Sequence, residues 1–434
     1  MFPNPQDALP LPARPSLEHY KKLAKELLRI AKSGDQPALS EWSRQWVESL
    51  VRLSGLTIPP GMPVRVERWA AQVAEYAQRK LMSAKGERCV LADAQFVLSR
   101  AHGFESWTAL ARHIDQLKHA FSTTSAFETC ADAIVNGDVD LLLTHVLADP
   151  ELVRARSPRE HNATLLHYVA ANGVEGWRQK TPPNIVEVAE ALLDNGAEID
   201  ATAEMYGGDC TTLGLAATSL HPERAGVQIA LLQLLLDRGA RRDLDNSAGN
   251  GQSLVKACLA NGRCGAAAFL ASRGAPLDLE DAIAVGDVEA ILRQTGDQDV
   301  RALLQRGDER ARQIAHGFGW ACMCGRMRAI ELLLELGYEP ATPGQDGQTG
   351  LHMAVIGAQL NVVRLLLRHR APLEAKNVYG GTVLGQALWC VQNHDSAQKF
   401  VPVLDELLAA GAIVEPEWEA ELVRVLGRGL SRSS

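Results

Sequence analysis

Apolar residues recur at helical spacing along most of the chain. From residue 17 to residue 30 an apolar residue returns every three or four positions, which predicts an amphipathic helix. Ser16 precedes this stretch and Gly34 follows it, and both residue types commonly cap helix ends. Five prolines among residues 1–15 predict an extended lead-in before it. The same periodicity predicts further helices at about 38–54, 64–85, 90–101 and 106–119.

Two short sequence patterns return from about residue 127 onward. The stretch DAIVNGDV at 132–139 returns as DAIAVGDV at 281–288, and LLDNGA at 192–197 returns as LLDRGA at 235–240. Each unit is predicted to hold two short helices, of which the second carries a leucine stripe and ends at a glycine that tolerates a left-handed cap. One such pair cannot bury its apolar face alone, whereas stacked neighbours can. The repetition therefore predicts a stacked array.

A further motif connects this array with a known family. Residues 349–354 read TGLHMA, residues 164–169 read TLLHYV, and Gly337 and Arg370 mark helix ends 33 residues apart. This motif and period resemble the ankyrin repeat. The resemblance covers roughly residues 127–414 in about eight units. It implies that the threonine and histidine of the motif organise the turn into the first helix, so His352 and His167 have structural roles.

The predicted fold class is all-α, with an ankyrin-like helical repeat solenoid after a small helical domain. We expect a helical N-terminal domain at 1–120, an array of about eight units at 121–414, and a C-terminal capping helix and tail at 415–434. The N-terminal domain resembles helical leaders that precede repeats in uncharacterised bacterial ankyrin proteins. Its simplest role is to seal the first repeat.

Charge is distributed unevenly along the 434 residues. Residues 1–120 hold 17 Lys and Arg against 12 Asp and Glu, whereas residues 121–434 hold 27 against 40. An acidic array disfavours nucleic acid and suits a protein partner with a basic patch. DNA binding by the N-terminal domain remains an alternative, although residues 106–117 offer only Arg112 as a strong cation for phosphate.

The sequence gives no sign of a cofactor, a metal or a membrane. The eight cysteines are scattered without a CxxC pair, no signal-peptide segment begins the chain, and no apolar run approaches the ~20 residues of a membrane span. These features predict a reducing cytoplasm. P-loop, GxGxxG, GxSxG and HExxH motifs are missing from the sequence, so catalytic residues are unknown and no enzyme activity is predicted.

Three repeat units carry extra residues between their two helices. About eleven are added between Gly173 and Asn184, a second addition is HPERAG at 221–226, and about eight fall within 391–399. The hairpin before Thr211 is also slightly long. Equivalent turns of a solenoid line up on one edge, where such additions often form a binding face. Tolerated surface loops are the alternative interpretation.

The first two additions and the adjacent repeat motifs bring together aromatic, charged and amide residues. Trp177 and Tyr206 offer rigid contact area, and Arg178 is suited to a carboxylate or phosphate. A general acid–base pair drawn from His167, Glu175 and His221 is a further alternative. The candidate partner- or ligand-binding residues are His167, Tyr168, Asn172, Glu175, Trp177, Arg178, Gln179, Lys180, Tyr206, Asp209 and His221.

The sequence therefore leads to one functional hypothesis and two alternatives. The hypothesis is non-catalytic recognition of a protein or peptide through the concave face and the inserted loops. The first alternative is a small-molecule-binding protein or enzyme with a pocket formed by 174–184 and 221–226, and the second is DNA binding by the N-terminal domain. A closed pocket with convergent polar groups favours the small molecule, and an open groove favours the protein.

Overall fold

The structure is a computed structural model that describes residues 4–54, 62–82, 89–119, 122–243, 248–249, 251–296, 299–393 and 397–427. Of residues 5 and 62–65, which lie within these ranges, the backbone alone is described. Contacts divide the chain into two compact units, Met1–Ala266 and Ala267–Ser434. Each unit is described by itself below.

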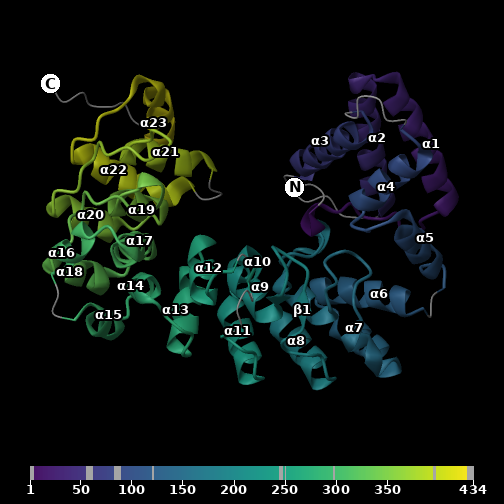
Figure 1. The fold of residues 1–434 in the computed structure, drawn as a ribbon, viewed down its shortest axis with the longest axis horizontal. Helices are drawn as coiled ribbons and strands as arrows, with labels where there is room; N and C mark the ends of the chain where they lie inside the picture. The colour runs from purple at the N-terminus through teal and green to yellow at the C-terminus, as the bar shows by residue number, and fades with distance from the viewer. Residues whose placement is uncertain are drawn as a thin grey trace. The chain divides into compact units, whose positions relative to one another are not determined.

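The first unit begins with a group of leader helices, drawn in purple and blue in Figure 1. Ser16 accepts a hydrogen bond from the backbone of His19, and Gly34 ends the first helix in the left-handed conformation, as expected from their sequence positions. Trp42 and Trp46 stack in the core of this group with ring centroids 5.3 Å apart. The elements are η1 (Pro5–Asp7), α1 (Leu17–Ser33), α2 (Gln36–Ser54), α3 (Met62–Leu81), α4 (Leu91–Ala101) and α5 (Trp107–Gln116).

The lead-in before α1 is attached to this helical core. Buried His102 uses both ring nitrogens, with Nδ1 2.9 Å from the Leu9 carbonyl oxygen and Nε2 2.8 Å from the Tyr20 hydroxyl. The Leu9 backbone also donates to the Ala101 carbonyl over 2.7 Å. These contacts hold Leu9, and residues 10–13, which follow it, line one wall of the cavity described below.

Helix pairs follow the leader in the first unit. The first helix of the second pair is a 3-10 helix that ends at Ala171 with a left-handed backbone. A small antiparallel ribbon pairs Thr202 with Thr211 and Ala203 with Cys210. The elements are α6 (Thr123–Asn136), α7 (Val139–Ala148), η2 (Pro150–Arg154), η3 (Leu165–Ala170), η4 (Gly176–Arg178), α8 (Ile185–Asp194), β1 (Thr202–Ala203), β2 (Cys210–Thr211), α9 (Thr212–Thr218), α10 (Leu220–Arg224), α11 (Gln228–Asp237) and α12 (Leu254–Ala260), with α13 (Cys264–Ser272) at the join between the units.

The second unit continues the helix pairs with inner helices that pack closely on one another (Figure 1). A Cβ at Gly317 of α17 would lie 2.9 Å from the Glu280 carbonyl oxygen of α14, so a residue without a side chain is needed for this close packing. The elements are α14 (Leu279–Val285), α15 (Val288–Thr295), α16 (Val300–Gln305), α17 (Glu309–Cys324), α18 (Met327–Glu335), η5 (Gln345–Gly347), α19 (Gly350–Ile356), α20 (Leu360–Arg368), α21 (Val383–Asn393), η6 (Ala397–Phe400), α22 (Val401–Ala409), η7 (Pro416–Trp418) and α23 (Glu419–Leu426).

The threonine–histidine motif has the structural role that the resemblance implied. His352 Nδ1 lies 2.9 Å from Thr349 Oγ1, and its Nε2 lies 3.3 Å from the Gly381 carbonyl oxygen at the next hairpin. His167 repeats the arrangement with Thr164 at 2.8 Å and the Cys210 carbonyl oxygen at 3.3 Å. Each histidine therefore connects one repeat to the following one.

The described part of the chain is an all-α repeat fold, apart from the short ribbon of β1 and β2. In chain order its helices form eight consecutive pairs, of which α6 with α7 is the first and α21 with α22 is the last. Within the described residues, no helix is long and apolar enough to cross a membrane.

Candidate functional site

The first insert is packed into the first unit instead of standing out as a loop. Its short helix η4 follows Glu175, which is fully buried, and ends at Arg178, whose side chain is 4% exposed. A Cβ at Gly176 would lie 2.5 Å from the Gln6 carbonyl oxygen, so the lead-in crosses the insert at close range. The insert therefore joins the lead-in to the first repeats.

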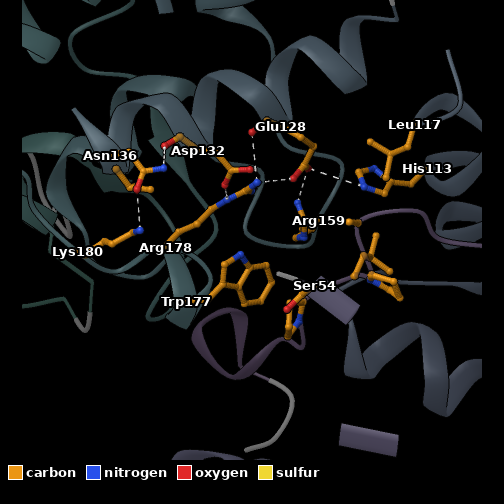
Figure 2. Close-up of a pocket in the computed structure, with 15 residues that line it drawn as sticks. Ser54, His113, Leu117, Glu128, Asp132, Asn136, Arg159, Trp177, Arg178 and Lys180 are labelled. Carbon is orange, nitrogen blue, oxygen red and sulfur yellow. Dashed lines mark hydrogen bonds and ion pairs between the residues drawn. The ribbon is translucent and has the colours of Figure 1, made fainter. Parts of the chain in front are cut away.

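Arg178 joins the insert to two carboxylates of α6 (Figure 2). Its Nη2 lies 2.8 Å from Glu128 Oε2, and its Nε donates to Asp132 Oδ1 over 2.7 Å. Glu128 also receives Arg159 Nη1 at 2.5 Å from the loop before η3. Glu128 therefore holds two arginines that arrive from different segments of the chain.

Glu175 completes this ion cluster from within the insert. Its Oε1 lies 3.0 Å from Arg159 Nη1, 3.6 Å from Arg178 Nη1, 3.4 Å from His161 Nε2 and 3.3 Å from the Tyr168 hydroxyl. Two buried arginines thus face buried Glu175 and Glu128, whose side chain is 13% exposed, which balances the charge that leaves water. We call Glu128, Arg159, Glu175 and Arg178 the ion cluster.

Protonation in the cluster is set by burial and by the two arginines. Burial favours a raised pKa for both glutamates, but Arg159 and Arg178 outweigh it, lowering the pKa of Glu128 to about 2 and holding that of Glu175 well below its usual value. Burial and then the Arg159 charge lower the pKa of His113, on α5, to about 4. At neutral pH both glutamates are charged and the His113 ring is neutral.

A cavity of about 490 Å³ lies beside the ion cluster (Figure 2). One wall is the lead-in, where Pro10, Leu11, Pro12 and Ala13 present mostly apolar surface. The other walls carry polar groups from α5, α6 and the insert. These are His113, Glu128, Asp132, Asn136, Arg159, Trp177, Arg178 and Lys180, with Ser54, Leu117 and Val135 completing the lining.

The structure brings some of the sequence-predicted residues into this site. Tyr168, Glu175, Trp177 and Arg178 lie at the ion cluster, and Arg178 and Arg159 each place their guanidinium carbon 6.0 Å from the Trp177 ring centroid. The Lys180 side chain is exposed at the edge, where its Nζ lies 2.8 Å from Asn136 Oδ1.

Other predicted residues have separate surroundings. Tyr206 Oη lies 2.8 Å from Asn172 Oδ1 and 3.0 Å from Gln6 Oε1, so the long hairpin also contacts the lead-in. Gln179 donates to the Val174 carbonyl inside the insert. Asp209 is exposed at a turn with φ of 58°.

The acid–base alternative paired Glu175 with His167 or His221, but in the structure Glu175 contacts a different histidine. The histidine that contacts Glu175 is His161, while His167 binds the Cys210 carbonyl oxygen. His221 lies near the start of α10, in the second insert, where its backbone donates to Ser219 Oγ.

Sequence reasoning missed several residues of the site, namely His113, Glu128, Asp132, Arg159 and His161. Glu128, Asp132 and Asn136 recur at every fourth position of α6, which places three polar residues on one helical face. That spacing was the available local signal. Arg159 and His161 lie in an irregular hairpin, where no periodicity marks a side chain's direction.

A second candidate site lies in the second unit, at the tip of the hairpin before α21. Asn377 Oδ1 accepts from the backbone of Tyr379 and of Gly381, each over 3.0 Å, and Gly380 has φ of 80°. The Val378 backbone donates to the Asp346 carbonyl of the preceding hairpin over 2.9 Å. The tip that carries Tyr379 is therefore held in one conformation.

Beside this tip is a groove of about 570 Å³, which we call the aromatic groove. Tyr379 is 79% exposed and Trp389, on the inner helix α21, is 53% exposed. Both charged residues in the lining are carboxylates, Glu415 and Glu417. The remaining lining residues are Gln348, Ile356, Asn377, Gly380, Gly381, Thr382, Gly385, Gln386 and Trp418.

Stacked helix pairs connected by threonine–histidine hairpins define a helical repeat protein. Residues 318–405 match the family described as ankyrin repeats in three copies. The chain therefore carries ankyrin repeats, as the resemblance indicated. Ankyrin repeats generally mediate interactions between proteins.

Two individual proteins are similar to parts of this chain. Protein PhlB of Serratia liquefaciens is 33% identical over 113 residues, which are 26% of this chain and 47% of that protein. The chain thus spans about half the length of this curated relative. The human ASB11 ankyrin repeat domain is 20% identical, with a TM-score of 0.35 over 66% of this chain and 99% of that one.

Proposed function

We propose that this chain recognises a protein partner through the aromatic groove of its second unit. The observation that carries the proposal is the exposure of Tyr379 and Trp389 beside one groove, in a chain with only 5% aromatic residues. Both residues lie within the stretch that matches ankyrin repeats. Tyrosine and tryptophan are the side chains that most often dominate binding energy at protein interfaces.

The residues of the aromatic groove are already ordered in the unbound protein. The Asn377 hydrogen bonds hold the hairpin tip, and Trp389 is carried on the regular helix α21. A surface that is already ordered loses little conformational entropy when it binds, which leaves more of the contact energy as affinity. These features favour a defined peptide segment over nonspecific apolar contact.

The charge of the groove indicates the partner's chemistry. Glu415 and Glu417 supply the formal charge among the described lining residues, so a cationic side chain on the partner is favoured. We infer that the partner segment presents an apolar side chain to Tyr379 and Trp389, with a Lys or Arg beside it. This agrees with the basic patch expected from the acidic array.

The first insert has a different role in this proposal. Glu175 and Arg178 are buried in the ion cluster, so a macromolecule has no access to them in this fold. Of the insert's charged side chains, Lys180 is the exposed one. We therefore assign partner recognition to the C-terminal repeats and assign to the insert the joining of leader and repeats.

The test is selection of peptides on the full-length protein from a random displayed library, followed by affinity measurement on variants. We expect selected peptides to combine an apolar residue with Lys or Arg. Because loss of a hot-spot side chain costs about 2 kcal/mol or more, Trp389→Ala or Tyr379→Ala should weaken binding about thirtyfold. Binding should also weaken as salt is added.

The matched control is Ile413→Ala, which removes another exposed apolar side chain of the second unit, 62% exposed. It should leave peptide affinity unchanged. Selected peptides that bind the Trp389→Ala and Tyr379→Ala proteins as tightly as the unaltered protein would overturn the proposal. Enrichment of acidic peptides would overturn the assigned partner chemistry.

A further inference from the structure

Among the described residues, three aromatic side chains line the aromatic groove, namely Tyr379, Trp389 and Trp418. Trp389 follows Gly385 by one helical turn, so these two positions share a face of α21. A Cβ added at Gly385 would lie 3.7 Å from Trp418 Nε1, so the Trp418 indole lies against that face where no side chain stands. Tyr379 borders the same space from the hairpin tip. Rings from three separate segments therefore meet at one groove.

Several hydrogen-bond acceptors near the hairpin tip are already engaged. Asn377 Oδ1 accepts from two backbone groups of the tip, and Thr382 Oγ1 accepts from the Gly385 backbone over 3.2 Å. The Gly381 carbonyl oxygen accepts from the Asn377 backbone over 3.1 Å and faces His352 Nε2 at 3.3 Å. A cation with N–H groups needs acceptors to replace the water that it leaves. This part of the groove therefore suits a cation that carries no N–H groups.

The carboxylates of the groove lie beside one of the rings in the chain. Glu415 and Glu417 directly precede Trp418 in the sequence, and Glu417 is exposed. Glu415 Oε1 lies 3.9 Å from Lys376 Nζ, whereas Glu417 has no ion-pair partner in the described part of the chain. A cation is also attracted to the faces of aromatic rings, and most strongly to tryptophan. Negative charge and aromatic surface together favour a cation whose own surface is apolar.

We propose that the aromatic groove binds a trimethylated lysine side chain of the protein partner, an inference that rests on the proposed function of this groove. The methyl groups contact Tyr379, Trp389 and Trp418. The positive charge is attracted by the rings and by Glu417, and it has no N–H groups that require acceptors. One side chain thus supplies both the apolar contact and the positive charge that the proposed function asks of the partner.

The experiment starts from the peptides selected on the full-length protein. Each lysine of a selected peptide is replaced in turn by trimethyllysine and by its neutral tert-butyl isostere, in which carbon takes the place of the ammonium nitrogen. Isothermal calorimetry compares the three forms. We expect the trimethyllysine form to bind about tenfold more tightly than either the lysine form or the isostere.

A smaller probe tests the groove without any selected peptide. It is trimethyllysine with an acetylated amino group and a methylamide in place of the carboxylate, compared with lysine capped in the same way. Saturation-transfer NMR on the full-length protein should detect contact with the capped trimethyllysine at millimolar concentration. Trp389→Leu should remove most of this signal.

Two variants separate attraction to the rings from apolar contact and from charge. Trp389→Leu keeps an apolar side chain but removes an aromatic face, so it should weaken trimethyllysine binding about tenfold and affect the isostere far less. Glu417→Gln should weaken trimethyllysine binding several-fold and leave the isostere unchanged. Glu331→Gln is the matched control, because Glu331 is an exposed glutamate of α18 that does not line the groove.

The Tm of each variant without ligand shows whether the fold is retained, and Glu417→Gln, at an exposed position, keeps the test open if Trp389→Leu unfolds. The inference is overturned if trimethyllysine binds no more tightly than lysine or the isostere, or if Glu417→Gln and Glu331→Gln have equal effects. It is also overturned if the capped trimethyllysine gives no signal, or a signal that survives Trp389→Leu.

Failure of this inference is distinguishable from failure of the proposed function. Unmodified peptides whose binding still depends on Tyr379 and Trp389 would leave the proposed function standing while trimethyllysine is rejected. Peptides that bind equally well after Tyr379→Ala and Trp389→Ala would reject the proposed function, whatever the methylation state of their lysines.

Discussion

Replacing Arg178 by Met tests whether the ion cluster stabilises the first unit. Methionine keeps an apolar stem against Trp177 but removes a cation that contacts Glu128, Asp132 and Glu175. Arg159 would then be the one arginine of the ion cluster facing both Glu128 and Glu175. Asp132, 57% exposed along its side chain, would return to water at little cost.

Removing one partner of a buried ion pair costs about 3–5 kcal/mol, because the charge left behind has no compensation. For a unit of this size, that cost corresponds to a Tm decrease of roughly 6–20 °C. The loss should be smaller at pH 4.5 than at pH 7, because protonation of Glu128 or Glu175 then removes the excess negative charge. A purely steric defect would have no such pH dependence.

Arg238→Met is the matched control. Arg238, the residue after α11, also contacts two carboxylates, Glu190 at 2.8 Å and Asp194 at 2.6 Å, but in the half-exposed setting where ion pairs contribute little. Thermal and urea unfolding of the full-length proteins, with hydrogen exchange read at α5 and α6, give the comparison. Equal losses for the two variants, or a loss at Arg178 that does not change with pH, would refute the reasoning.

Three further predictions follow from single residues. Because burial lowers the pKa of His113 to about 4 from 6.5, protons bind the unfolded state first, so urea titrations should show stability falling as pH decreases from about 6.5 to 4. His113→Gln should flatten this part of the pH profile. Gly176→Ala should force the Gln6 carbonyl away at a cost of about 1–3 kcal/mol, with faster hydrogen exchange at residues 6–9. Asn377→Ala should loosen the tip that carries Tyr379 and weaken peptide binding without changing Tm, as calorimetry on the selected peptides would show.

The repeat architecture was accessible from sequence because its signals are local. A leucine stripe, a terminal glycine and the threonine–histidine motif act within a few residues of one another, and the structure shows the expected helices and caps. The structure adds one longer contact that the motif alone did not predict, since the histidine at 352 reaches the next hairpin in the same way as the one at 167.

The ion cluster was not accessible in this way. Glu128 pairs with Arg159 and Arg178, which lie 31 and 50 residues further along the chain. No periodicity connects a helix of the first repeat, a hairpin and an insert. The sequence identified the insert as unusual and named Glu175 and Arg178, but charged residues in an inserted turn are more often solvated, and burial depends on a counter-charge that only the fold supplies.

The aromatic groove was missed for a different reason. Trp389 lies on a first helix, where an aromatic residue in an apolar pattern is usually part of the core, and Tyr379 lies in a turn of ordinary length. Exposure is a property of the stacked repeats and not of the local pattern. Additions of residues drew attention to the inserts, whereas Tyr379 and Trp389 both lie before the addition at 391–399.

The two sites also differ in the kind of ligand they can accept, and the difference comes from how each is held. The cavity of the first unit is walled by charges that need one another, so a large partner could enter only by breaking the ion cluster. The aromatic groove is held by backbone hydrogen bonds of Asn377 that remain intact while Tyr379 and Trp389 stay exposed. A partner can therefore cover them without disturbing the repeats. On this physical basis we propose the second unit, and not the first, as the site of a protein partner.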